Sequence, residues 1–106
     1  MTVKFKETAT SEQVAGFDAA LAALPAQIDL IRGTRHGRDL GERPTNADYA
    51  LVTEFDDAAA FHVYLEHPAH QAVVRDHLAP LADSFHSTQF LVDGQDRPAG
   101  GRHHLA

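Results

Sequence analysis

The chain has 106 residues, of which 43% are apolar and 23% charged, the size and composition of one small globular domain. Its 9 basic and 15 acidic side chains give a formal net charge of −6, which argues against a surface that binds nucleic acid through clustered cations. The absence of cysteine excludes disulfides, thiolate nucleophiles and cysteine-ligated metals. Because no apolar stretch approaches the roughly 18 residues needed to cross a bilayer and none is typical of a signal peptide, we expect a cytoplasmic protein without membrane contact.

The first half of the chain predicts three strands and one helix. Period-2 alternation or β-branched residues indicate the strands, over residues 2–6, 28–37 and 49–55. Thr10 and Gln13 fit a capping box that begins the helix, and we expect Pro25 to end it. Gly, Pro and Asn residues over 39–48 predict a loop before the third strand.

A proline divides the helical part of the second half. Asp56 or Asp57 is expected to cap a helix, which Pro68 then interrupts by pushing His67 out of the α conformation. Proline is favoured at the first position of a helix, so a second helix begins there and is expected to continue until Pro80 stops it.

The last predicted strand is apolar on both faces. It covers residues 85–92, and its apolar side chains alternate: Phe85 and Leu91 on one face, Phe90 and Val92 on the other. We assign residues 1–93 to one domain and expect residues 94–106 to form a polar, disordered tail.

The resulting element order, β-α-β-β-α-β, predicts an α+β, ferredoxin-like fold: an antiparallel sheet with both helices on one face. Because the helices can cover only one face of the sheet, we expect a second copy of the chain to cover the other. The sequence therefore predicts a homodimer formed through the sheet faces.

The segment around Pro68 carries the side chains of greatest chemical interest. His70 lies in the first turn of the second helix, where the positive end of the helix dipole favours a neutral ring that can accept a proton. Tyr64, on the preceding helix, can present its phenol to the same pocket as a donor. We take His70 and Tyr64 as candidate catalytic residues. Three further residues are candidate ligand-binding residues: His67, Tyr49 and Phe61. A structural alternative stays open, in which His67 ends one helix and His70 bonds to a backbone carbonyl.

A metal site is another interpretation of the histidines. It would combine His70 and His77 with His62, His67 or Asp76. His70 and His77 are seven residues apart, or about 10 Å along a helix, whereas a tight site favours spacings of three or four. We therefore expect no metal, and no motif for a nucleotide or other cofactor is present.

Residues 64–70 read Tyr-Leu-Glu-His-Pro-Ala-His and are similar to the Tyr-x-x-His-Pro-x-His signature of the stress-responsive dimeric A/B-barrel (Dabb) family. The opening strand, the capped helix and the strand at 48–55 also resemble that family, from Thr2 to about Val92. The resemblance implies a ferredoxin-like monomer whose sheet packs on a second copy to form a barrel across the dimer. One branch of the family resembles plant olivetolic acid cyclase, a cofactor-free polyketide cyclase; its general-base histidine falls on His70 and its tyrosine partner on Tyr64.

Three functions are compatible with these features. The first is a small homodimeric stress-response protein that binds a small organic ligand in a pocket between sheet and helices. The alternative is a cofactor-independent cyclase or lyase that uses His70 as general base. The third is a structural dimer that assembles further or recruits a partner.

Overall fold

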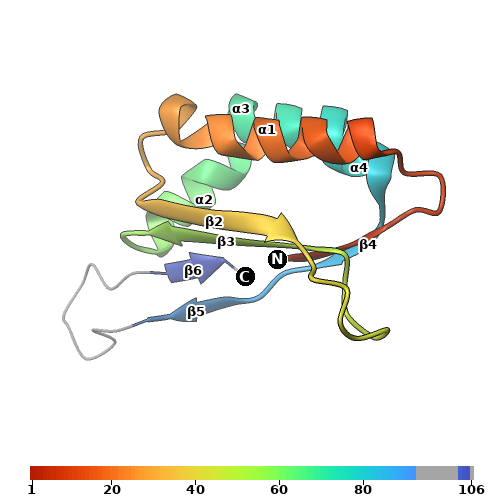
Figure 1. The fold of residues 1–106 in the computed structure, drawn as a ribbon. Helices are drawn as coiled ribbons and strands as arrows, with labels where there is room; N and C mark the ends of the chain where they lie inside the picture. Colours follow the sequence, from red (N-terminus) through yellow and green to blue (C-terminus); the bar gives the residue numbers. More distant parts are fainter. Residues whose placement is uncertain (93–102, 106) are drawn as a thin grey trace.

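A layer of helices lies across one face of an antiparallel sheet (Figure 1). The computed structural model describes residues 1–92 and 103–105. The strands are β1 (Thr2–Phe5), β2 (Gly33–Arg38), β3 (Tyr49–Phe55), β4 (Ala82–His86), β5 (Gln89–Leu91) and β6 (His103–Leu105). The helical elements are α1 (Ser11–Gln27), α2 (Ala58–Glu66), α3 (Pro68–Val73), the π-helical turn η1 (Val74–Leu78) and α4 (Ala79–Leu81). Within the described ranges, no helix combines the length and the apolar character that a membrane crossing requires.

The four main strands have the order β4-β1-β3-β2, and every pair of neighbours is antiparallel. With the helices between and after them, they form the ferredoxin-like α+β fold that the element order predicted. β6 pairs with the end of β3 that β1 leaves free, and β5 pairs with β6.

Alternation along β3 separates the core from the open face of the sheet. The buried side chains of β3 face the helices: Tyr49, Leu51, Thr53 and Phe55. The buried side chains of α1 recur every three or four residues: Val14, Phe17, Leu21 and Leu24. These two sets meet between the layers, and most of them join one hydrophobic core.

The predicted helix starts are confirmed. The Gln13 N–H donates to the Thr10 hydroxyl at 3.1 Å, and the Thr10 N–H donates to the Gln13 side-chain carbonyl at 2.9 Å, which completes the capping box. Asp57 caps α2, and His67 is extended at φ −65°, ψ 132°, so that Pro68 begins α3.

Both prolines expected to end helices lie inside them, so these two predictions are wrong. Pro25 has no N–H to give to the preceding turn, but the Ile28 N–H still bonds to the Leu24 carbonyl at 2.9 Å and completes the last turn of α1. Pro80 lies in α4, after a π turn in which the Ala79 N–H bonds to the Val74 carbonyl.

Two strands also differ from the prediction. The strand expected over 28–37 begins at Gly33, because Ile28 instead caps α1 and is buried in the core. The strand expected over 85–92 is divided: β4 ends at His86, and β5 begins at Gln89.

The predicted tail is corrected in part. Residues 93–102 and 106 lie outside the described residues, so the expectation of disorder is not tested there. His103–Leu105 form β6, where the free edge of β3 offers backbone hydrogen bonds to the returning chain.

Candidate functional site

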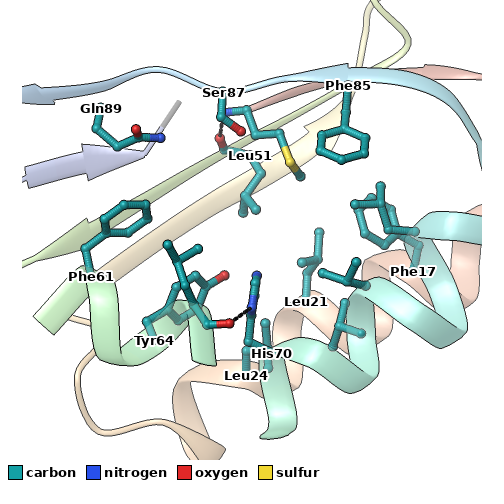
Figure 2. Close-up of a pocket in the computed structure, with 15 residues that line it drawn as sticks. Phe17, Leu21, Leu24, Leu51, Phe61, Tyr64, His70, Phe85, Ser87 and Gln89 are labelled. Atoms are coloured by element: carbon teal, nitrogen blue, oxygen red, sulfur yellow. Dashed lines mark hydrogen bonds between the residues drawn. The ribbon is translucent and has the colours of Figure 1, made fainter. Parts of the chain in front are cut away.

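A cavity of about 440 Å³ lies between the helices and the sheet. Its apolar wall includes Phe17, Leu21, Leu24, Leu51, Phe61 and Phe85 (Figure 2). Among the described residues that line it there is no lysine, arginine, aspartate or glutamate; the polar side chains are those of Tyr64, His70, Ser87 and Gln89. Small-molecule sites typically measure about 300–1,000 Å³ and combine an apolar wall with a few polar groups. The cavity has both properties.

The ring of His70 is held in one tautomer by the end of the preceding helix. Its Nδ1 lies 3.2 Å from the backbone carbonyl oxygen of Leu65. A carbonyl oxygen can only accept a hydrogen bond, so Nδ1 carries the proton, and Nε2 of the neutral ring has a free lone pair. Figure 2 shows the ring standing into the cavity with this second nitrogen at its inner end. His70 can therefore accept a proton from a molecule bound there.

Burial lowers the pKa of His70 below its ordinary value of 6.5. The hydrogen bond to the Leu65 carbonyl opposes this effect, and the charge of His67 adds to it. The neutral form of His70, which a general base requires, is therefore favoured at neutral pH.

Tyr64 stands beside His70, with 4.3 Å between the two ring centroids. Its side chain is almost completely buried, and burial raises the pKa of its phenol to about 12. The phenol thus stays protonated, and its hydroxyl is directed to the same cavity (Figure 2). Phe61 lines the cavity next to this pair. The structure brings together three of the five candidate residues.

The other two candidates lie elsewhere. His67 caps α3, where its Nδ1 accepts the Ala69 N–H at 3.1 Å, and it does not line the cavity. Tyr49 is buried on β3, and its hydroxyl donates to the Asp18 carboxylate rather than facing the cavity. Neither of these two side chains lines this cavity.

Tyr49 belongs to a polar cluster that ties α1 to the sheet. Nδ1 of His36, on β2, lies 2.7 Å from the Tyr49 hydroxyl oxygen and 3.1 Å from Oδ1 of Asp18, on α1. The hydrogen bond from Tyr49, more than the charge of His36, lowers the pKa of Asp18. Burial and the neighbouring carboxylate raise the pKa of Tyr49. This cluster connects three elements but opens into no cavity described above.

Comparisons with known proteins agree with the ferredoxin-like fold described above. Residues 1–92 match the family model of the stress responsive A/B barrel domain (Dabb). The chain belongs to the Dabb family. An uncharacterized protein of Streptomyces coelicolor is 44% identical over 55 residues, a match that covers 52% of this chain and 57% of that relative. The chain thus matches little more than half the length of this curated relative.

Two solved structures have folds similar to that of this chain. A dimeric ferredoxin-like protein of unknown function from Thermobifida fusca is 32% identical, with a TM-score of 0.72 over 78% of this chain and 77% of that one. A hydroxynitrile lyase from Passiflora edulis is 17% identical, with a TM-score of 0.69 over 78% of this chain and 80% of that one. The latter likeness concerns the fold alone.

The sequence patterns did not identify Ser87 and Gln89, the polar side chains that line the cavity on its sheet side. The alternation of residues 85, 87 and 89 contained a signal, because all three line the cavity. In the part of the chain that the structure describes, no group of three or more histidine or acidic side chains is placed to hold a metal ion.

Proposed function

We propose that this Dabb-family protein binds a small, mostly apolar organic molecule in the cavity between its sheet and its helices. The observation that supports this most directly is the cavity itself: about 440 Å³ of space with an apolar wall and a few convergent polar groups. An apolar ligand that fills this space removes the apolar wall from water, which favours binding.

Thermal unfolding with a ketone panel tests this proposal. A ligand that binds the folded state alone stabilises it by about 2.7 kcal/mol at a hundred times its Kd, so the melting temperature rises with ligand concentration. 4-Phenyl-2-butanone is a suitable first compound, because it has an apolar ring and one carbonyl. Leu21→Phe, which fills the cavity, should abolish the rise, whereas Leu40→Phe, on an exposed side chain, should retain it. Equal shifts in both variants would mean that binding occurs elsewhere.

A second candidate function is cofactor-free proton transfer, favoured by the free Nε2 of His70. In this reaction Nε2 removes a proton from the carbon next to a carbonyl group. The Tyr64 hydroxyl donates a hydrogen bond to the carbonyl oxygen, on which negative charge develops as the enolate forms. The protonated His70 then returns the proton to carbon, or the enolate carbon attacks a second carbonyl group of the ligand. In the second case the C=O π bond breaks as the C–C bond forms and the new alkoxide oxygen takes the proton from His70, as in a cyclase; the reverse of this step is the bond cleavage of a lyase.

Hydrogen–deuterium exchange tests this chemistry without knowledge of the natural substrate. The protons next to the carbonyl of 4-phenyl-2-butanone should exchange in D₂O faster with the protein than without it, followed by NMR. General-base catalysis is worth about 10²–10⁴-fold, so His70→Ala should lower the exchange rate by that factor. His62→Ala, on an exposed histidine of α2, should not change it. An undiminished rate in His70→Ala would exclude His70 as the base.

The dimer is proposed to form through the open face of the sheet. The Thermobifida fusca relative is dimeric, which supports a homodimer. The open face of the four main strands is less apolar than the sequence predicted. Phe90 and Leu91 were expected in the last of these strands, but they lie on the separate strand β5. The open face nevertheless presents small and medium side chains such as Ala50 and Val52, which a second sheet can approach closely.

We also propose that the protein is located in the cytoplasm, and cell fractionation tests this location.

A further inference from the structure

The cavity has polar groups at two opposite ends. Tyr64 and His70 lie at the helix side, whereas Ser87 and Gln89 lie across the cavity on the sheet side (Figure 2). Apolar side chains of α1 and Leu51 of β3 line the space between them. A molecule that spans the cavity would therefore meet polar groups at both ends and an apolar wall along its length.

The sheet-side pair is available for a ligand. Ser87 precedes β5 and Gln89 begins it, at the break that separates this strand from β4. Both residues are exposed, and within residues 1–92 their side chains have no hydrogen-bond partner. A hydroxyl and an amide together can donate and accept hydrogen bonds, so they suit an uncharged polar group.

The charge of the cavity restricts the ligand further. No cationic side chain lines the cavity in the described part of the chain, and the whole chain has a net charge of −6. The α-amino group of Met1, a lining residue, donates to the Leu51 carbonyl at 2.7 Å, and burial lowers its pKa to about 6, so that it is mostly neutral at pH 7. A carboxylate placed between these walls would therefore lose its hydration and gain little counter-charge. The helix-side pair offers a donor, the Tyr64 hydroxyl, and an acceptor, His70 Nε2, which suits a carbonyl group with an adjacent C–H bond.

We propose that Ser87 and Gln89 form an outer subsite that determines specificity, and that the ligands of this protein are neutral ketones with a second, uncharged polar group at the far end of an apolar body. This inference rests on the proposed function, because it names the ligand class of the same cavity. A volume of 440 Å³ equals that of about 15 water molecules, which limits such a ketone to on the order of 10–20 non-hydrogen atoms.

Three compounds that differ at one end test the subsite: 4-phenyl-2-butanone, 4-(4-hydroxyphenyl)-2-butanone and 4-(3-oxobutyl)benzoate. Calorimetric titration of the full chain should show that the hydroxyl improves the Kd about 2- to 12-fold over the parent ketone, the range for one net hydrogen bond. The carboxylate should bind more weakly than the hydroxyl compound. The double variant Ser87→Ala, Gln89→Met should lose the hydroxyl preference, so that it binds the parent ketone and the hydroxyl compound with equal Kd.

Thr88→Val is the matched control, because Thr88 lies between the two residues but does not line the cavity. It should retain the full hydroxyl preference. A wild-type protein without that preference, a preference that survives the double variant, or tight binding of the carboxylate would each overturn the subsite. The parent ketone distinguishes failure of the outer subsite from failure of the ligand site. If this ketone binds and the hydroxyl group does not improve the Kd, only the subsite is excluded. If neither ketone binds, the proposed ligand site fails as well.

Discussion

His70 is less hydrated in the cavity wall than in the unfolded chain, where its pKa is near 6.5. Below pH 6.5 the unfolded state therefore binds a proton that the folded state takes up only at lower pH. Stability must then fall as the pH decreases through this interval, and it is fully present above it. The group that is proposed to act as a base thus also makes folding sensitive to mild acid.

We expect the unfolding free energy of the wild-type protein to decrease more between pH 7.5 and 5 than that of His70→Gln, which cannot titrate. Urea unfolding at a series of pH values measures the difference, and subtraction of the two curves removes the contribution of the other ionisable groups. His62→Gln, on the exposed face of α2, should follow the wild-type curve. Parallel curves for wild type and His70→Gln would contradict the lowered pKa.

The two tyrosines of the chain should respond differently to loss of the hydroxyl. The Tyr49 hydroxyl bonds to Asp18 and His36, so Tyr49→Phe should lower the unfolding free energy by about 1–2 kcal/mol. The Tyr64 hydroxyl faces the cavity, so Tyr64→Phe should cost less than about 0.5 kcal/mol in stability and instead weaken ketone binding. Urea unfolding at pH 7, with calorimetry of both variants, distinguishes these roles. Equal losses of stability would mean that both hydroxyls are structural.

At the scale of elements, the break between α2 and α3 positions the site. His67 caps α3 through its ring, Pro68 begins the helix, and His70 then reaches the Leu65 carbonyl at the end of α2. Because these contacts connect residues that are close in the chain, the pairing of Tyr64 with His70 could be predicted from the sequence. The cap interaction also occupies Nδ1 of His67, whose side chain does not line the cavity.

Replacing His67 separates capping from ligand binding. Asparagine is a good N-cap residue and alanine a poor one, so His67→Ala should lower the unfolding free energy by about 1 kcal/mol and His67→Asn by much less. The Kd for 4-phenyl-2-butanone should be the same in His67→Asn and in the wild type. A weaker Kd in His67→Asn, at unchanged stability, would return His67 to the binding site.

Elements with strong local signals could be predicted, and those that depend on distant partners could not. The capping box at Thr10 and the alternation along β3 act within a few residues. By contrast, Ile28 has the β-branched side chain typical of a strand, but it caps α1 and is buried in the core. The bond from Tyr49 to Asp18 joins residues 31 positions apart, and periodicity cannot report such a contact.

At the scale of the whole molecule, one face of the sheet has no cover among residues 1–92 and 103–105. The helices lie on the other face (Figure 1), and the residues of β3 that alternate with its buried ones are Ala50, Val52 and Glu54. Ala50 lies opposite Thr2 on β1 and Gly37 on β2, so this part of the face is small and uncharged. Two such surfaces can approach closely, as packed sheets do at about 10 Å.

Light scattering at micromolar concentration should therefore give about twice the 11.5 kDa of one chain. Ala50→Glu should convert the dimer to a monomer, because a carboxylate buried between two sheets without a counter-charge loses roughly several kcal/mol of hydration. Ala59→Glu introduces the same side chain at an exposed position of α2 and should leave the dimer intact. Retention of the dimer in Ala50→Glu would place the interface elsewhere, whereas a monomeric wild type would mean that the open face is not an interface in this protein. Circular dichroism of Ala50→Glu should give the spectrum of a folded protein, in which case loss of the dimer can be attributed to the interface.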